Sequence, residues 1–253
     1  DRSMKMGKLL KFEFRKITRQ KSFYICFGIA LLILALSAVI LKAAVNEAGS
    51  TEVFSPVSFS LTALTSSSFT LVLGIFVALY CCADYSDNTL KNIYSRGYTR
   101  AQVYFAKYLV SLLLSLAVAV LFFLWAFIFG KKFGNTEEAV TQEFIISVVC
   151  QLVIVAGYHA VYFSLAMIIG NVVGSFAVNL VVPMLVITVL TLLTSLLKIE
   201  NITLNSYWLD APMSSLSQGA AQSSLFLKSI VMSVVYAGIF VTGGYFLNRK
   251  KEI

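Results

Sequence analysis

Long stretches without a charged residue alternate with short charged clusters along this chain. The charge-free windows are Phe23–Leu41, Val53–Ala83, Tyr108–Gly130, Phe144–Leu197 and Ser229–Asn248. A helix needs about 20 mainly apolar residues to cross the hydrocarbon core of a bilayer. The fourth window is long enough for two crossings and a tight turn. The pattern therefore predicts six transmembrane helices.

These spans divide the chain into a short N-terminal segment, residues 1–22, and a membrane domain, residues 23–253. The first apolar run is of full spanning length and no small-residue cleavage site follows it, so we expect a retained helix rather than a signal peptide. The expected fold class is an all-α polytopic membrane protein. The six spans are predicted at 23–42, 58–83, 106–130, 144–170, 174–197 and 227–248.

The N-terminal segment is basic and amphipathic. Met6, Leu10, Phe14 and Ile17 would share one face of a helix, and lysines and arginines would take the other. This pattern favours an interfacial helix that lies along the inner leaflet of the membrane. A solvated basic tail and a contact with a soluble partner are the alternatives.

Composition and charge support the membrane assignment and orient the chain. Hydrophobic residues make up 58% of the chain and charged residues 13%, against about 25% charged residues in soluble domains. Fifteen of the 20 basic residues lie before the first span, between the second and third, or after the last. Basic segments face the cytoplasm. We therefore expect a multi-pass membrane protein with both termini cytoplasmic. Its net charge of +8 indicates contact with anionic lipid rather than with nucleic acid.

The sequence offers few candidates for chemistry inside the membrane. The single histidine, His159, lies near the middle of the fourth span. An ionisable residue at that depth suggests a function, but a neutral histidine can also bond a neighbouring helix. Ser66, Ser67 and Thr70 belong to a hydroxyl-rich half of the second span. They could line a polar path or only allow close helix packing.

Several functional classes are disfavoured. The sequence holds no nucleotide-binding glycine loop, no H-E-x-x-H, no G-x-S-x-G and no paired acids within the predicted spans. The four cysteines lie in or beside apolar spans without metal-ligand spacing, so we expect packing residues and neither a disulfide nor a metal site. We expect no catalytic residue and no cofactor on this chain. An intramembrane enzyme is disfavoured, and energy for transport would have to come from another subunit.

The cytoplasmic connector between the second and third spans, 84–107, is the most informative segment. Asp87 or Asn88 could cap a short helix that runs through about Ser95, and Gly97 would end it. Thr99 would cap the third span. A short helix that projects into water with an apolar face needs a partner for that face. We therefore expect another protein to cover Leu90, Ile93 and Tyr94.

Two further segments carry local predictions. Pro183 would kink the fifth span, because proline removes a backbone donor. Residues 198–225 lie on the outer side and contain aromatic residues suited to the interface. We expect one or two short helices there, dipping into the outer leaflet.

Taken together, the chain resembles the permease subunits of ABC type-2 exporters. The resemblance rests on the basic N-terminal helix, the six spans, the connector and the long outer segment. An acidic residue followed by the run from Asn88 to Ile93 and then by Ser95 to Arg100 is similar to the family's acid…GTLKN…S…R pattern. Asn88 stands where glycine is common.

The resemblance implies a coupling helix that docks on a separate ATP-binding subunit, which carries Mg-ATP. It also implies a second permease chain, for which a homodimer is expected, and a path between the two chains. Bacterial members export peptides, lantibiotics, lipids, polysaccharides or drugs, and an amphipathic peptide is our best guess here. The alternative is a self-contained secondary transporter or channel. The implied partner-binding residues are Asp87, Asn88, Thr89, Leu90, Lys91, Asn92, Ile93, Tyr94 and Arg96.

Overall fold

The fold was analysed in a computed structural model that describes residues 2–47, 55–86, 89–134, 140–196, 204–218 and 223–249. All regular structure within these ranges is helical. The elements are α1 (Arg2–Thr18), α2 (Lys21–Glu47), α3 (Pro56–Thr65), α4 (Ser67–Ser86), α5 (Thr89–Ser95), α6 (Arg100–Phe133), α7 (Gln142–Ile169), α8 (Val172–Leu196), the 3-10 helix η1 (Leu204–Tyr207), α9 (Asp210–Ser217) and α10 (Ser223–Arg249).

Six helices in the described part of the chain are long and apolar enough to cross a membrane, which confirms the predicted number of candidate spans. They are Tyr24–Glu47, Ser68–Tyr85, Arg100–Phe133, Gln142–Ile169, Val172–Leu196 and Ser224–Arg249.

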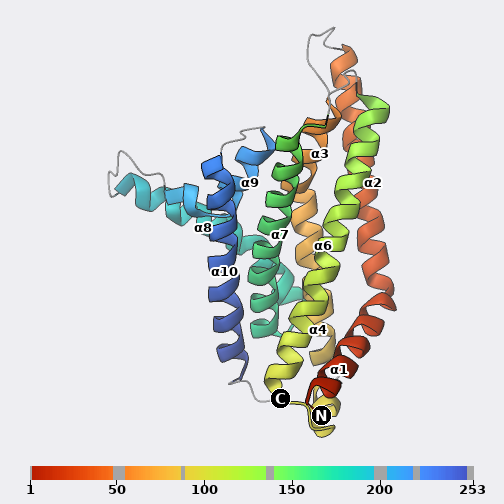
Figure 1. Cartoon of the computed structure of the whole chain (residues 1–253), viewed down its shortest axis with the longest axis vertical. Coiled ribbons are helices and arrows are strands. Elements are labelled where there is room, and N and C mark those ends of the chain that lie inside the picture. The colour runs from red at the N-terminus through yellow and green to blue at the C-terminus, as the bar shows by residue number, and fades with distance from the viewer. Residues whose placement is uncertain are drawn as a thin grey trace.

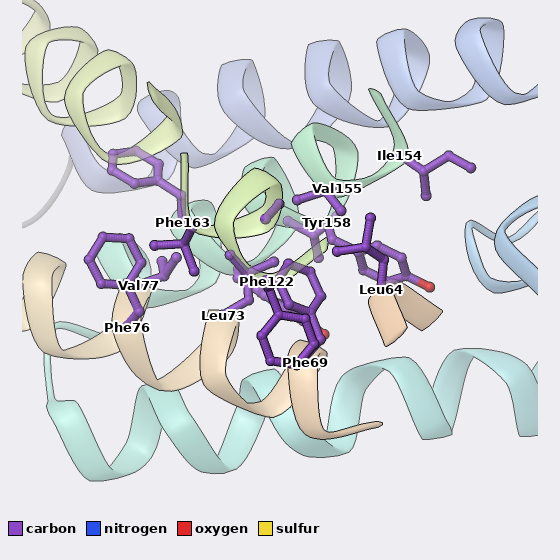
Figure 2. Packing of buried hydrophobic residues seen from close by; sticks show 14 of the residues in the cluster. Leu64, Phe69, Leu73, Phe76, Val77, Phe122, Ile154, Val155, Tyr158 and Phe163 are labelled. Carbon is purple, nitrogen blue, oxygen red and sulfur yellow. The ribbon is translucent and has the colours of Figure 1, made fainter. Parts of the chain in front are cut away.

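Helix α7 occupies the centre of the bundle (Figure 1). It packs against α4, α6, α8 and α10, whereas α2 packs against α4 and α6. The core between α4, α6 and α7 contains Phe69, Leu73, Phe122, Tyr158 and Phe163 (Figure 2). By contrast, only 6% of the apolar window of α8 is buried, against 61% for α7. Most of the α8 surface is therefore free to contact lipid or another protein.

The second predicted span is not one helix. Residues 58–83 were expected to be continuous, but the chain is extended at Ser66, with ψ 143°, and α3 and α4 meet there. The Ser66 hydroxyl donates to the carbonyl of Ala63 (2.6 Å) and accepts from the N–H of Phe69 (3.3 Å). One serine thus ends α3 and caps α4. Hydroxyl groups that satisfy a broken helix make the break tolerable within an apolar segment.

The helix ends predicted at Gly97 and Thr99 are present, and Gly170 lies where the fourth span, 144–170, was predicted to end. Thr99 and Gln102 form a reciprocal capping box at the start of α6, with N···O distances of 3.0 and 3.3 Å. Gly97, with φ 81°, follows α5 and donates its N–H to the carbonyl of Tyr94. Gly170, with φ 73°, ends α7 in the left-handed conformation that glycine favours.

Helix α1, helix α5 and the C-terminal end of α10 lie at the same end of the bundle (Figure 1). Arg100 at the start of α6 donates to the backbone carbonyl of Arg249 (2.6 Å), which joins α10 to this end. We call it the basic end. The opposite end holds α3, η1 and α9. There Leu209, Met213 and Leu216 are buried, and α9 packs against α3, α7 and α10.

Candidate functional site

Helix α5 is attached to its own chain through its apolar face. Leu90 and Ile93 are only 2% and 7% exposed. They pack with Leu9 of α1 and with Val103 and Ala106 of α6. The sequence-based expectation that another protein must cover this face is therefore wrong. Helix α1 folds back beneath the connector and supplies the cover, and no local sequence pattern specifies where α1 lies.

The opposite face of α5 is exposed and polar. Lys91, Asn92, Ser95 and Arg96 are accessible, while Tyr94 is half-buried. Burial raises the pKa of the Tyr94 phenol, and nearby Arg100 opposes this, so the side chain is neutral at pH 7. A hollow of about 520 Å³ beside this face is lined by Lys91, Tyr94, Tyr98, Thr99 and Arg100. The predicted residues Asp87 and Asn88 lie outside the described residues.

A buried group of charged and polar side chains lies directly behind α5. We call it the polar cluster, and its members are Glu13, Lys16, Tyr80, Asp84, Thr89 and Lys107. The carboxylate of Asp84 accepts hydrogen bonds from Lys16, Lys107 and the Thr89 hydroxyl. Thr89 is the first residue of α5, so this contact ties the coupling-helix candidate to the end of α4.

The other half of the polar cluster is centred on Glu13. Its Oε2 accepts from the Tyr80 hydroxyl at 2.7 Å and lies 3.6 Å from Nζ of Lys107. Nζ of Lys107 also lies 4.8 Å from the centroid of the Tyr80 ring. Glu13 and Lys107 are fully buried and Asp84 is 1% exposed. Because buried charges are costly without partners, this arrangement holds α1, α4, α5 and α6 in one geometry.

Sequence reasoning did not single out Glu13, Lys16 or Lys107 as members of a site. The signal that could have found them is helical spacing. Glu13 falls between Leu9 and Ile17 at intervals of four residues, and all three are buried. Lys107 likewise follows buried Val103 by four residues and precedes buried Ser111 by four. A charge within a buried helical stripe indicates a partner on another helix.

His159 lies in the core and bridges α7 to α6. Its Nε2 lies 3.0 Å from the hydroxyl of Ser111 and its Nδ1 lies 2.9 Å from that of Ser115. Both ring nitrogens are thus engaged by one neighbouring helix. This is the geometry of an interhelical hydrogen-bond bridge, and the ring does not line the pocket described next.

A pocket of about 400 Å³ opens between α4, α7 and α8, near the start of α9. Of the predicted path residues, Thr70 lines it, whereas Ser66 forms the helix break and Ser67 begins α4. The pocket residues are Thr65, Thr70, Leu71, Gly74, Tyr158, Tyr162, Phe176, Asn179, Leu180, Pro183, Met184, Ile187 and Asp210.

Comparison with known families decides the class of protein. The family model described as ABC-2 family transporter protein matches residues 9–189, which is more than half of the chain. The chain belongs to the ABC-2 transporter family. Its role is therefore that of a membrane transport component rather than a catalytic subunit. The match takes in α5, the polar cluster and most of the pocket of this permease. A comparison with curated proteins finds no match.

Proposed function

We propose that this permease is the transmembrane subunit of an ATP-driven exporter in the bacterial plasma membrane. A separate ATP-binding subunit would carry Mg-ATP and dock on the exposed polar face of α5. The observation that carries the proposal is the two-sided character of α5. One side is fixed on α1 and α6, and the other presents Lys91, Asn92 and Arg96 to a partner.

The contacts of α5 suit a helix that transmits force. Its start is tied to α4 through Thr89 and Asp84, and Asp84 is tied to α6 through Lys107. Its apolar side rests on α6 directly. A partner that displaces α5 would therefore move the ends of α4 and α6 together, because packed helices and ion pairs shift as units.

The basic end of the molecule also supports a proposed orientation in the membrane and a proposed contact with lipid. We place the basic end in the cytoplasm, with both termini there. The face of α1 that packs on the protein contains Leu9, Glu13 and Ile17. Of the residues predicted to face the membrane, Ile17 is therefore buried in the protein, whereas Phe14 is 51% exposed. Phe12, 47% exposed, and Phe14 lie on opposite sides of the stripe through Leu9, Glu13 and Ile17, because residues two apart do not share a helix face. Phe14 would enter the inner leaflet.

The exposed surface of α8 suits contact with a second permease chain, and we propose a homodimer. Cargo would move along the path between the copies. An apolar pocket at α4 and α8 fits an amphipathic cargo, with a peptide toxin or antimicrobial peptide as our choice. We also propose that residues 1–22 form an interfacial helix and residues 23–253 the membrane domain.

Charge reversal on the exposed face tests the docking site. Lys91→Glu with Arg96→Glu should abolish co-purification of the ATP-binding subunit and ATP-dependent export, while the permease still folds. The matched control reverses Lys131 and Lys132 at the other end of α6 and should leave both intact. Retention of the complex by the α5 variant contradicts the proposal. Proton- or sodium-driven uptake by the permease alone would instead support a secondary transporter.

A further inference from the structure

The pocket between α4, α7 and α8 contains an acid without a basic partner. Asp210 at the start of α9 accepts hydrogen bonds from the Tyr158 hydroxyl and, at 3.1 Å, from Nε1 of Trp208. Both donors are neutral. The ion pairs found among the described residues all belong to the polar cluster, and Asp210 takes part in none. Asp210 is partly exposed in the first turn of α9, and two hydrogen bonds hold its carboxylate, which has no salt bridge among the described residues.

Asn179 provides a second unused acceptor in the same pocket. The side chain is 3% exposed and its Nδ2 donates to the carbonyl of Gly74 (3.4 Å). Its Oδ1 has no partner in the described part of the chain. In addition, Pro183 lies four residues later in α8 and has no N–H, so the backbone carbonyl of Asn179 receives no hydrogen bond from that position. Buried acceptors without donors are costly.

The rest of the wall is apolar or aromatic. Leu71, Phe176, Leu180, Met184 and Ile187 line the pocket together with the Tyr158 and Tyr162 rings. A pocket with this lining favours a mainly hydrophobic ligand that a few polar groups orient. The unpaired Oδ1 of Asn179 and the carboxylate of Asp210 favour a ligand whose polar group is a hydrogen-bond donor with a positive charge. Aromatic rings add attraction for a cation.

We propose that this pocket binds a molecule with an apolar body and one primary ammonium group, with Asp210 pairing the charge and Asn179 accepting a hydrogen bond. The ammonium could belong to an amphipathic cargo or to an ethanolamine lipid. Naming this as the cargo class rests on the proposed exporter function, whereas the binding itself does not.

Gly74 allows the pocket to be closed without altering its charge. A Cβ at this position would lie 3.5 Å from Cβ of Asn179 and 4.0 Å from the Tyr162 ring. Alanine therefore fits at ordinary contact distance. A leucine would extend from that point into the space between the two side chains.

Saturable binding of radiolabelled octylamine to the purified full-length permease in a neutral maltoside detergent tests the site, with octanol as the uncharged probe. Asp210→Asn removes the charge and keeps one oxygen, which can accept from Nε1 of Trp208 while the new amide N–H donates to the Tyr158 hydroxyl. We expect at least a tenfold weaker octylamine affinity and unchanged octanol binding. Gly74→Leu should abolish saturable binding of both probes, and Gly74→Ala should retain it. Glu143→Gln, which removes an exposed acid at the start of α7, should change neither.

The proposal is overturned if Asp210→Asn binds octylamine within twofold of the wild type, or if it loses octanol equally. Failure of Gly74→Leu to affect binding would also overturn it, and thermal melting identifies any variant that is misfolded.

Competition with lipids separates the two possible sources of the ammonium group. Displacement by phosphatidylethanolamine but not by phosphatidylglycerol assigns the site to lipid, and failure of both to displace octylamine assigns it to cargo. ATP-dependent export by a permease that does not bind octylamine rejects only the pocket. Octylamine binding by a permease that co-purifies with no ATP-binding subunit from membranes and shows no ATP-dependent export rejects only the exporter function.

Discussion

The Nζ atom of Lys107 lies 3.6 Å from Oε2 of Glu13, and both side chains are fully buried. This pair joins α6, the third span, to α1, the helix that the sequence suggests rests on the membrane surface. Helix α1 is therefore part of the packed protein at its basic end. Its position also determines how α5 is supported, because Leu9 of α1 covers Leu90.

Removal of Lys107 should destabilise the permease strongly. Lys107→Met would leave Glu13 without a cation and Asp84 with Lys16 as its one cation. Loss of one partner from a buried pair costs about 3–5 kcal/mol. Thermal unfolding in detergent should show a large drop in midpoint temperature.

The double variant Lys107→Met with Glu13→Gln is the informative comparison. It should recover part of the loss because Asp84 and Lys16 remain as a neutral pair. Lys91→Met on the exposed face should change stability by less than about 0.5 kcal/mol. If Lys107→Met unfolds like the wild type, the polar cluster does not hold the helices together.

The Tyr80 hydroxyl should contribute a smaller, separable amount. Tyr80→Phe keeps the ring beneath Lys107 but removes the 2.7 Å hydrogen bond to Glu13. A buried acceptor that loses its donor costs about 1–3 kcal/mol. Tyr24→Phe removes an exposed hydrogen bond to the Thr18 carbonyl and should cost less. Equal unfolding midpoints for the two variants would mean that the hydrogen bond from Tyr80 to Glu13 does not stabilise the protein.

Truncation of the buried face of α5 should unfold the connector rather than affect only partner binding. Leu90→Ala removes a side chain that is 2% exposed, and such changes cost about 2–5 kcal/mol. Limited proteolysis between α4 and α6 should become faster in the permease alone. Asn92→Ala on the exposed face should leave the proteolysis rate unchanged. Resistance of the Leu90 variant would mean that α1 and α6 do not support α5.

Of two glycines in α10, Gly244 lies in a close contact with neighbouring helices and Gly238 does not. A Cβ at Gly244 would lie 2.7 Å from the Tyr104 hydroxyl and 2.8 Å from Cβ of Ser164, whereas a Cβ at Gly238 meets nothing within 4 Å. Gly244→Ala should cost about 1–3 kcal/mol through overpacking. Gly238→Ala in the same helix should be neutral or stabilising. The two unfolding midpoints compare them directly, and a neutral Gly244 variant would refute this packing.

The sequence predicted what depends on local pattern and missed what depends on tertiary position. Windows without charge predicted the number of candidate spans, and Thr99 and Gly97 were recognised at helix ends because capping is local. The break at Ser66 was missed, since an apolar window reports compatibility with lipid and not helical continuity. The cover over Leu90 was missed because it depends on where α1 folds. Asp210 and Asn179 meet one pocket from α9 and α8, and no spacing in the sequence brings them together.

The proposal on which export depends is that an ATP-hydrolysing subunit binds the exposed face of α5. A photo-crosslinking amino acid at Asn92 or Arg96 tests this directly in membranes that contain the intact transporter, with Lys131 as the site at the far end of α6. We expect a covalent product between the permease and an ATP-hydrolysing subunit from positions 92 and 96, and none from position 131. Active export with no such product from α5, or with a product from position 131, would contradict it.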